Sequence, residues 1–240
     1  MTRTPSHDSF AGSSAALVQD YDLTGRLVQT VSEAADHLGA AAAGLLVTNR
    51  AGELELLSAT SHVAAALETY QALSGEGPCQ ECMRQEASVS FGLAEVTERW
   101  RPLAELMEAA GYTDIIAAPL RWRGTTLGGL NLFWTGLPGE VRELEVEAQV
   151  YGDILTLFII NSDPVSPGAA RERLENALAG RAVIEQAKGV LAEQRALDLG
   201  DAYRQLLELE KETGQPLTEV ARSLIRAAQE PGSRSRSVSR

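Results

Sequence analysis

Residues 174–199 read LENALAGRAVIEQAKGVLAEQRALDL, and this stretch decides how the second half of the chain folds. Its apolar side chains recur every seven residues, which predicts one long amphipathic helix. Two rows form the apolar face: Ala177, Ile184 and Leu191, and beside them Val183, Val190 and Leu197. We therefore expect a helix over residues 174–199 that packs against neighbouring helices.

A row of cations runs along another face of the same helix. Arg181, Lys188 and Arg195 also recur at seven, which places three positive charges within about 20 Å. Glu185 lies between the first two and can pair with either, so spacing alone favours an ordinary solvated face. Gly189 costs about 1 kcal/mol relative to alanine in a helix, which suggests that another helix or a ligand approaches it closely.

The order of residues in this helix is more specific than their spacing. The run RAVIEQAKGVL at 181–191, followed by Ala202-Tyr203 and Val220-Ala221, resembles the ANTAR domain of transcription antitermination regulators. The resemblance covers about residues 170–228. It implies a three-helix RNA-binding domain that recognises paired stem-loops in nascent transcripts and so prevents a terminator hairpin from forming.

The resemblance also implies which residues contact RNA. The cations would contact phosphates or the loop backbone, Gly189 would permit close approach, and Tyr203 would pack while partly exposed. The expected RNA-binding set is Arg181, Lys188, Gly189, Arg195, Tyr203 and Arg204. This interpretation requires that Arg181 and Lys188 are not buried in permanent carboxylate pairs.

Two shorter helices are expected to follow. Asp201 is placed to cap a helix that runs through Thr213, and Thr218 to cap a third helix over residues 217–225. The second helix departs from the family pattern, because Leu207 stands where the family usually has a basic residue and Glu210 where it has alanine. Both departures make this helix less suited to RNA.

The charge of the chain is divided unevenly. The net charge is −12, but residues 1–164 hold 9 Lys+Arg and 22 Asp+Glu, whereas residues 165–240 hold 12 and 11. The first part, at −13, disfavours a nucleic-acid partner. The second part, at +1, can bind RNA only through a local cluster of cations, and such binding should be sensitive to salt.

The first half has the pattern of a mixed domain. Turn residues and apolar runs predict strands at 45–48, 54–59, 88–91, 115–122 and 126–134. The same patterns predict a first helix that ends near residue 39, helices over 63–73, 78–86 and 101–110, and a long helix that begins at 141. This order resembles a GAF domain over about residues 17–160. The expected class is therefore α+β: a GAF-like antiparallel sheet with helices, followed by a small three-helix all-α domain.

Two prolines, Pro164 and Pro167, break the chain between these parts. We expect a disordered N-terminus at 1–14, a GAF-like sensor domain at 15–160, a linker at 161–168, an ANTAR-like domain at 169–229 and a basic disordered tail at 230–240.

The last helix of the first domain carries an apolar stripe with alternating spacings of three and four: Val141, Leu144, Ala148, Tyr151, Leu155 and Phe158. Such a stripe lies either on the domain's own sheet or in a helical bundle. The first helix carries a similar stripe. We expect the two helices to form the interface of a homodimer.

Candidate chemistry is sparse. Cys79 and Cys82 have the spacing of a reactive dithiol or of half a metal site. Only three histidines accompany them, so buried structural cysteines are the favoured interpretation and no metal, cofactor or catalytic residue is expected. A pocket between the sheet and its helices is expected to serve any small-molecule ligand, which the sequence does not identify.

The sequence thus predicts a cytoplasmic, non-enzymatic regulator in which a GAF-like sensor controls an RNA-binding output for stem-loops. No secretory signal or membrane span is expected. Two alternatives stay open. One is a DNA- or protein-binding transcription regulator that uses the same three helices, and the other is a thiol redox sensor or enzyme that uses Cys79 and Cys82.

Overall fold

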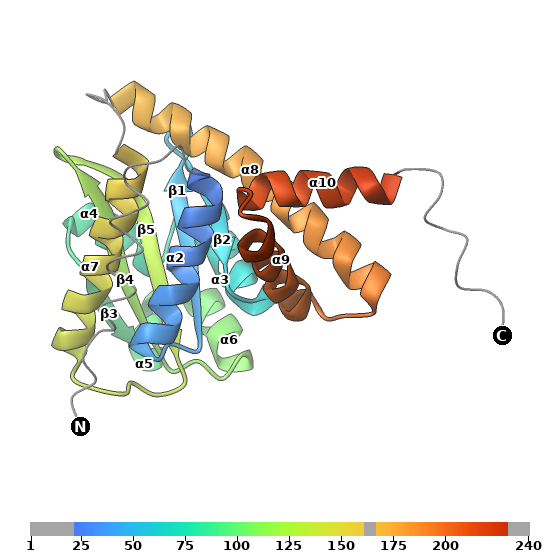
Figure 1. Cartoon of the computed structure of the whole chain (residues 1–240). Coiled ribbons are helices and arrows are strands. Elements are labelled where there is room, and N and C mark those ends of the chain that lie inside the picture. Colours follow the sequence, from blue (N-terminus) through green and yellow to red (C-terminus); the bar gives the residue numbers. More distant parts are fainter. Residues whose placement is uncertain (1–21, 161–166, 230–240) are drawn as a thin grey trace.

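The computed structural model describes residues 22–160 and 167–229, which form two domains (Figure 1). The N-terminal domain is an antiparallel sheet with helices on both faces, and the C-terminal domain consists of three helices. The predicted α+β class is confirmed. The disordered segments expected at 1–14 and 230–240 lie outside the described residues, as does most of the expected linker at 161–168.

The sheet has the spatial order β2-β1-β5-β4-β3, and all neighbouring strands are antiparallel. Its strands are β1 (Ala42–Thr48), β2 (Leu54–Ala59), β3 (Val89–Gly92), β4 (Asp114–Trp122) and β5 (Thr125–Trp134). The hairpin expected around Arg123 and Gly124 joins β4 to β5. Both residues have positive φ, at 48° and 74°, which is the pattern of a type I′ turn.

Six helices of the N-terminal domain cover this sheet within the described residues. They are α2 (Leu23–Leu38), α3 (His62–Ser74), α4 (Pro78–Gln85), α5 (Leu93–Arg99), α6 (Arg101–Ala109) and α7 (Val141–Ile160). The short α5 was not expected from the sequence. α2 and α7 pack on one face, and α3 to α6 lie on the other.

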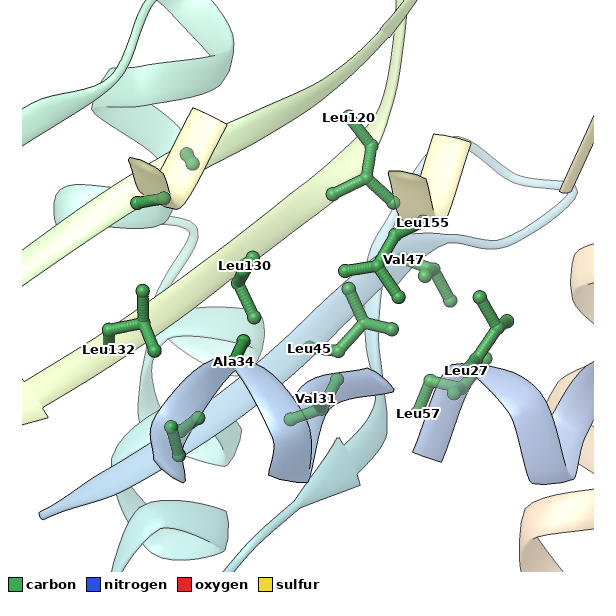
Figure 2. Packing of buried hydrophobic residues seen from close by; sticks show 14 of the residues in the cluster. Leu27, Val31, Ala34, Leu45, Val47, Leu57, Leu120, Leu130, Leu132 and Leu155 are labelled. Atoms are coloured by element: carbon green, nitrogen blue, oxygen red, sulfur yellow. The ribbon is translucent and has the colours of Figure 1, made fainter. Parts of the chain in front are cut away.

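The larger core lies between the sheet and the helix pair α2 and α7. Figure 2 shows Val31 and Ala34 of α2 facing the side chains of β1 and β5, with Leu155 of α7 beside Leu120. The residues labelled there are all less than 2% exposed. Burying a leucine or valine side chain stabilises the fold by about 1.5–3 kcal/mol. This stripe pattern is why the helices could be predicted.

The apolar stripe of α7 lies on its own sheet. Leu144, Ala148, Leu155 and Phe158 are buried in the same core as α2, and Tyr151 packs against it. The apolar stripes of α2 and α7, from which a dimer interface was expected, are therefore buried within one chain. A second set of apolar residues points outward from α7, where Val146 and Leu157 are 61% and 50% exposed.

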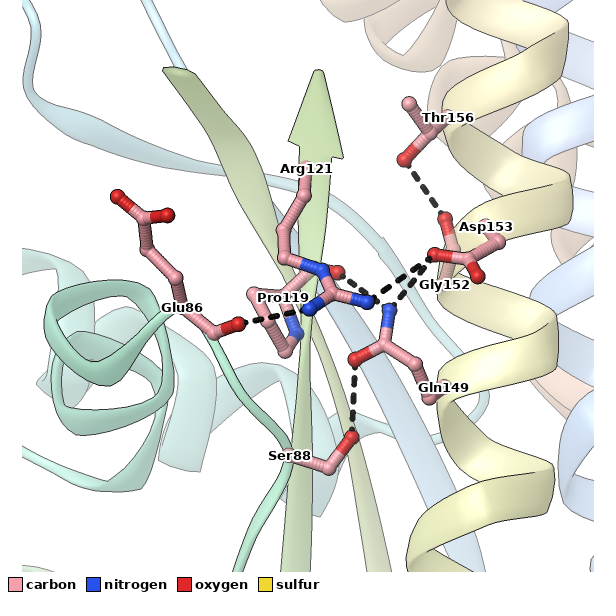
Figure 3. A network of polar contacts seen from close by, with 8 residues as sticks. All are labelled: Glu86, Ser88, Pro119, Arg121, Gln149, Gly152, Asp153 and Thr156. Carbon is pink, nitrogen blue, oxygen red and sulfur yellow. Dashed lines mark hydrogen bonds and ion pairs between the residues drawn. The ribbon is translucent and has the colours of Figure 1, made fainter. Parts of the chain in front are cut away.

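A polar network joins α7 to β4 at the edge of the helix pair (Figure 3). Gln149 Nε2 donates to the carbonyl of Pro119 at 3.1 Å, and its Oε1 accepts from Ser88 Oγ at 3.0 Å. Arg121 Nη2 lies 3.9 Å from Asp153 Oδ1, one turn further along α7. These contacts fix the position of α7 along β4, because two successive turns of the helix are each tied to the strand.

The C-terminal domain consists of α8 (Pro167–Arg195), α9 (Leu199–Thr213) and α10 (Leu217–Gln229). Ile184, Ala187 and Leu191 of α8 are buried against residues of the other two helices. α8 begins inside the expected linker and ends at Arg195, four residues before the predicted end. Ala196 follows with a φ of +51°, which is incompatible with a continued right-handed helix.

The predicted helix caps are wrong at both shorter helices. α9 begins two residues before Asp201, and Asp198 Oδ1 accepts the Asp201 N–H at 2.8 Å. The N–H of Thr218 at the start of α10 donates to Asp22 Oδ2 at 2.7 Å. Asp22 precedes α2, so a residue 196 positions away caps this helix.

The two domains pack against each other along α8 (Figure 1). Leu174 and Ala177 of α8 are buried in the core of the N-terminal domain. Thr24 Oγ1 of α2 donates to the carbonyl of Ala177 at 3.1 Å, and Arg50 pairs with Glu175 at 3.2 Å. α8 is therefore a helix that belongs to both cores.

A polar cluster is buried on the other face of the sheet. Glu68 and Asn131 are fully buried, and Asn131 Nδ2 donates to Glu68 Oε2 at 2.7 Å. Glu68 Oε1 and Asn131 Oδ1 have no hydrogen-bond partner within the described chain. Burial raises the pKa of Glu68 well above its ordinary value, and the nearby Cys79 raises it further. A proton on Oε1 turns this oxygen into a donor, which accounts for two buried acceptors in one place.

We predict that Glu68→Gln stabilises the protein at high pH. A raised native pKa means that the stabilisation is complete below the ordinary pKa and is lost as the pH rises through the native pKa. Urea unfolding should show the wild type losing stability above about pH 5, at about 1.4 kcal/mol for each pH unit between the ordinary and the native pKa. The variant should show a flatter profile.

Glu108→Gln makes the same chemical change at an exposed carboxylate of α6, on the same side of the sheet. It is the matched control and should leave the wild-type pH profile unchanged. Identical pH profiles for the wild type and Glu68→Gln would contradict a protonated Glu68.

Candidate nucleic-acid interface

The cationic row on α8 is divided by the N-terminal domain. Arg181 lies on the part of α8 that crosses β2, and its Nη1 donates to the carbonyl of Leu56 at 2.5 Å. β2 is an edge strand, so this guanidinium covers an otherwise open carbonyl. Burial lowers the pKa of Arg181, and the charges of Glu185 and Glu55 oppose that effect. Arg181 therefore faces the sheet in this state.

Lys188 lies at the contact between the domains and pairs within its own domain. Its Nζ lies 2.9 Å from Glu185 Oε1 and 5.4 Å from the centre of the Tyr203 ring, and its side chain is only 13% exposed. The pair with Glu185 was one of the two that the sequence allowed. Glu185 itself is 46% exposed, so this ion pair is open to solvent on one side and contributes little to stability.

Tyr203 packs between the domains. Its ring contacts the core formed by α2 and α7 as well as the core of the C-terminal domain. Burial, followed by the charges of Glu210 and Glu185, raises its pKa. The nearby Ser32 hydroxyl opposes part of that rise.

Arg195, Arg204 and Gly189, the other residues of the expected RNA-binding set, lie outside the contact between the two domains. Arg195 is exposed and its Nη1 donates to Gln205 Oε1 at 2.7 Å, while Arg204 pairs with Asp201 and its side chain is 71% exposed. Gly189 is also exposed, and a Cβ placed on it would meet nothing within 4 Å. The sequence suggested that either another helix or a ligand approaches Gly189. No described helix does so, and the approach of a ligand stays a prediction.

The close helix approach occurs at Gly180 instead. A Cβ on Gly180 would overlap Thr24 Oγ1 and lie 2.9 Å from Thr24 Cβ. Gly180 thus allows α8 to lie directly on α2. The sequence contained this signal, because Gly180 also interrupts the helical pattern, but it did not indicate which glycine faces a neighbour.

A small cleft separates β2 and α3 from α8 and α9, with a volume of about 170 Å³. Arg181, Lys188 and Tyr203 line it from the C-terminal domain. Ser61 and His62 line it from the N-terminal domain, at the start of α3. The structure therefore brings together three of the six predicted RNA-binding residues, and it turns them toward the sheet rather than toward solvent.

The two cysteines do not line this cleft. Both are fully buried, and Cys82 Sγ donates to the carbonyl of Cys79 at 3.0 Å. Cys82 and burial raise the pKa of the Cys79 thiol well above its ordinary value. A protonated, buried thiol is a poor nucleophile, so the geometry favours the structural interpretation of the pair.

Side chains pack closely between the sheet and α4 at two glycines. A Cβ on Gly129 would lie 2.7 Å from Cys79 Sγ, and one on Gly77 would lie 2.8 Å from Gln71 Cγ. Within residues 22–160 and 167–229, no group of three or more His, Cys, Asp or Glu side chains is arranged to hold a metal ion.

The fold combines a sheet domain with a helical domain, and the sheet domain covers part of the helical one. Family models identify both parts: a GAF domain matches residues 22–148, and an ANTAR domain matches residues 172–225. The chain belongs to the GAF family and carries an ANTAR domain after it. No curated protein matches the chain.

Solved structures resemble the GAF fold at low identity. The GAF domain of the phosphoenolpyruvate-protein phosphotransferase from Acinetobacter is 13% identical with a TM-score of 0.51, and covers 69% of this chain and 98% of its own. The phycoerythrobilin-bound GAF domain of a cyanobacterial phytochrome is 14% identical with a TM-score of 0.51, and covers 73% and 100%. In the part of the chain described here, no helix is both long and apolar enough for a membrane span.

We predict that Gly180→Leu separates the domains while each keeps its fold. The new side chain has no room against Thr24, and overpacking of this kind costs about 1–3 kcal/mol. Small-angle X-ray scattering should show a larger radius of gyration, and trypsin should cut after Arg181 faster. Gly189→Leu makes the same chemical change at an open position of α8, and it should alter neither measurement.

Proposed function

We propose that this protein is an RNA-binding transcription antitermination regulator, in which the GAF domain controls stem-loop binding by the ANTAR domain. The ANTAR domain supplies the RNA-binding function by family membership. The observation that carries the proposal is the division of the cationic row, since Arg195 and Arg204 are exposed while Arg181, Lys188 and Tyr203 face the GAF domain. Action on nascent transcripts requires a protein in the cytoplasm, and the proposed role requires no catalysis.

This arrangement gives the GAF domain a direct means of control. RNA reaches Arg181 and Lys188 only after α8 and α9 move away from β2 and α2. The contacts that oppose this movement include two hydrogen bonds, from Thr24 to the Ala177 carbonyl and from Thr218 to Asp22. A signal that binds the closed and open states unequally shifts the population between them.

The acidic departure in α9 lies near the GAF domain. Glu210 stands where the family usually has alanine. Burial and the charge of Asp22 raise its pKa, and the charge of Arg26 on α2 offsets part of that rise. Glu210 therefore lies near GAF-domain charges of both signs.

RNA binding is tested with an RNA that carries two neighbouring hairpins. Gly180→Leu should bind this RNA more tightly than the wild type does, because it uncovers Arg181 and Lys188. Adding Lys188→Ala should weaken binding by about tenfold, as expected for one charge-assisted hydrogen bond, and should lower the salt dependence by about one ion. Gel shifts at several salt concentrations measure both effects.

Arg226→Ala removes an exposed arginine of α10 outside the row, and it should leave RNA affinity within about twofold of its parent. Duplex DNA serves as the competitor in the same assay. Stronger competition by duplex DNA than by hairpin RNA, or an unchanged affinity in Lys188→Ala, would refute the proposed function.

We further propose that the protein is a homodimer, since two ANTAR domains match paired stem-loops and divalent binding raises the apparent affinity. The outward residues Val146 and Leu157 of α7 supply an apolar surface for this contact. Leu157→Glu should shift the protein to monomer in analytical ultracentrifugation. Val63→Glu, at a similarly exposed valine on α3, should not, and a monomeric wild type would contradict the proposal.

A further inference from the structure

Arg181 forms no direct ion pair within residues 22–160 and 167–229. Its side chain is half-buried, and its hydrogen-bond partner is the uncharged carbonyl of Leu56. Burial lowers its pKa, and the charges of Glu185 and Glu55 offset that effect only in part. A partly desolvated cation of this kind favours an anion in the adjacent space.

The adjacent space is the cleft, and other donors line it. Lys188, paired with Glu185, contributes a second cation, and the Tyr203 hydroxyl lies beside Ser32, which also lines the cleft. Ser61 and His62 add polar side chains from the opposite wall. Donors from both domains therefore surround one volume, which is the arrangement by which proteins hold a compact anion.

The start of α3 adds to the positive potential. Ser61 caps this 13-residue helix by accepting the Ala64 N–H at 3.0 Å, and the first turn contains no acidic residue. The first N–H groups of a helix have no intrahelical partners, and the helix dipole is positive at this end. His62 and the cap thus face the cleft at a helix end that favours negative charge.

We propose that the cleft between the GAF and ANTAR domains binds a phosphate group, either as inorganic phosphate or as the monoester of a small metabolite. A phosphate offers several acceptor oxygens and at least one negative charge to donors on different walls. The volume of about 170 Å³ is below the usual range of about 300–1,000 Å³ for ligand pockets, so the ligand is small. Glu185 also lines the cleft and competes for Lys188, which disfavours a large polyanion.

A bound phosphate would bridge the two domains. Its oxygens would pair with Arg181 and Lys188 on one side and with the start of α3 on the other. The ligand would thus stabilise the closed state and occupy cations that RNA requires. This consequence rests on the proposed function, whereas the binding site itself does not.

The site is tested by isothermal titration calorimetry on the full chain, with inorganic phosphate in one arm and ribose 5-phosphate in another. Sodium chloride keeps the ionic strength constant. We expect saturable binding with one site per chain, and tighter binding of one of the two ligands identifies the source of the phosphate. Arg181→Gln should weaken binding at least tenfold, and Arg226→Gln should leave it unchanged.

Tyr203→Phe removes the hydroxyl that lies beside Ser32 in the cleft, so it should weaken phosphate binding severalfold. Gly180→Leu should abolish binding, because the site needs both walls. Equal affinity in the wild type, Arg181→Gln and Gly180→Leu would overturn the site, as would the absence of saturable binding.

The outcome for RNA is read separately. If phosphate binds as expected and lowers RNA affinity in the wild type but not in Gly180→Leu, both proposals stand. If phosphate binds as expected and hairpin RNA never binds, the site stands and only the antitermination function fails. If hairpin RNA binds and phosphate does not, the site alone is refuted.

Discussion

The direct contact of α8 with α2 is the constraint on which the rest of the structure depends. Gly180 lets the two helices touch at Thr24, and the hydroxyl of Thr24 donates to the Ala177 carbonyl. Because α8 is a single helix from Pro167 to Arg195, its position at one end fixes the direction of its other end. The placement of Arg181 over β2, and of Tyr203 against the GAF core, follows from this one approach.

The contact of Arg181 with the acidic GAF domain is not an ion pair. The GAF half supplies the negative charge of the chain, and Arg181 contacts its surface through a carbonyl rather than through a carboxylate. A neutral partner holds the guanidinium more weakly than an ion pair would. The contact is therefore one that a competing anion can replace, whether it comes from a polynucleotide or from a small molecule.

Local pattern determined most of the fold. Apolar periodicity located the strands and the longer helices, because burial on one face has a fixed spacing along the chain. It did not locate α5, whose seven residues carry too little periodicity. Apolar periodicity also placed the end of α8 too late. Ala196 adopts a left-handed conformation that the neighbouring residue types do not predict. The sequence likewise offered Asp201 and Thr218 as caps, whereas Asp198 and the distant Asp22 cap the two helices.

The candidate site was predictable in composition but not in orientation. The residues of the row were named from a family resemblance, and their spacing placed them on one helix. Whether they face solvent depends on contacts between residues far apart in sequence, such as Arg181 with Leu56 across 125 positions. The same holds for the glycines of α8, since the sequence predicted a close approach at Gly189, whereas the folded chain covers Gly180.

The capping bond from Thr218 to Asp22 has a consequence for how the chain assembles. The last described helix receives its cap from the residue that precedes the first one, so the bond spans 196 positions. Asp22 is synthesised long before α10, so the cap partner is already present when α10 forms and only has to come into contact with it. The opposite holds for α2, because its contacts with the C-terminal domain form only after α8 and α10 have been synthesised.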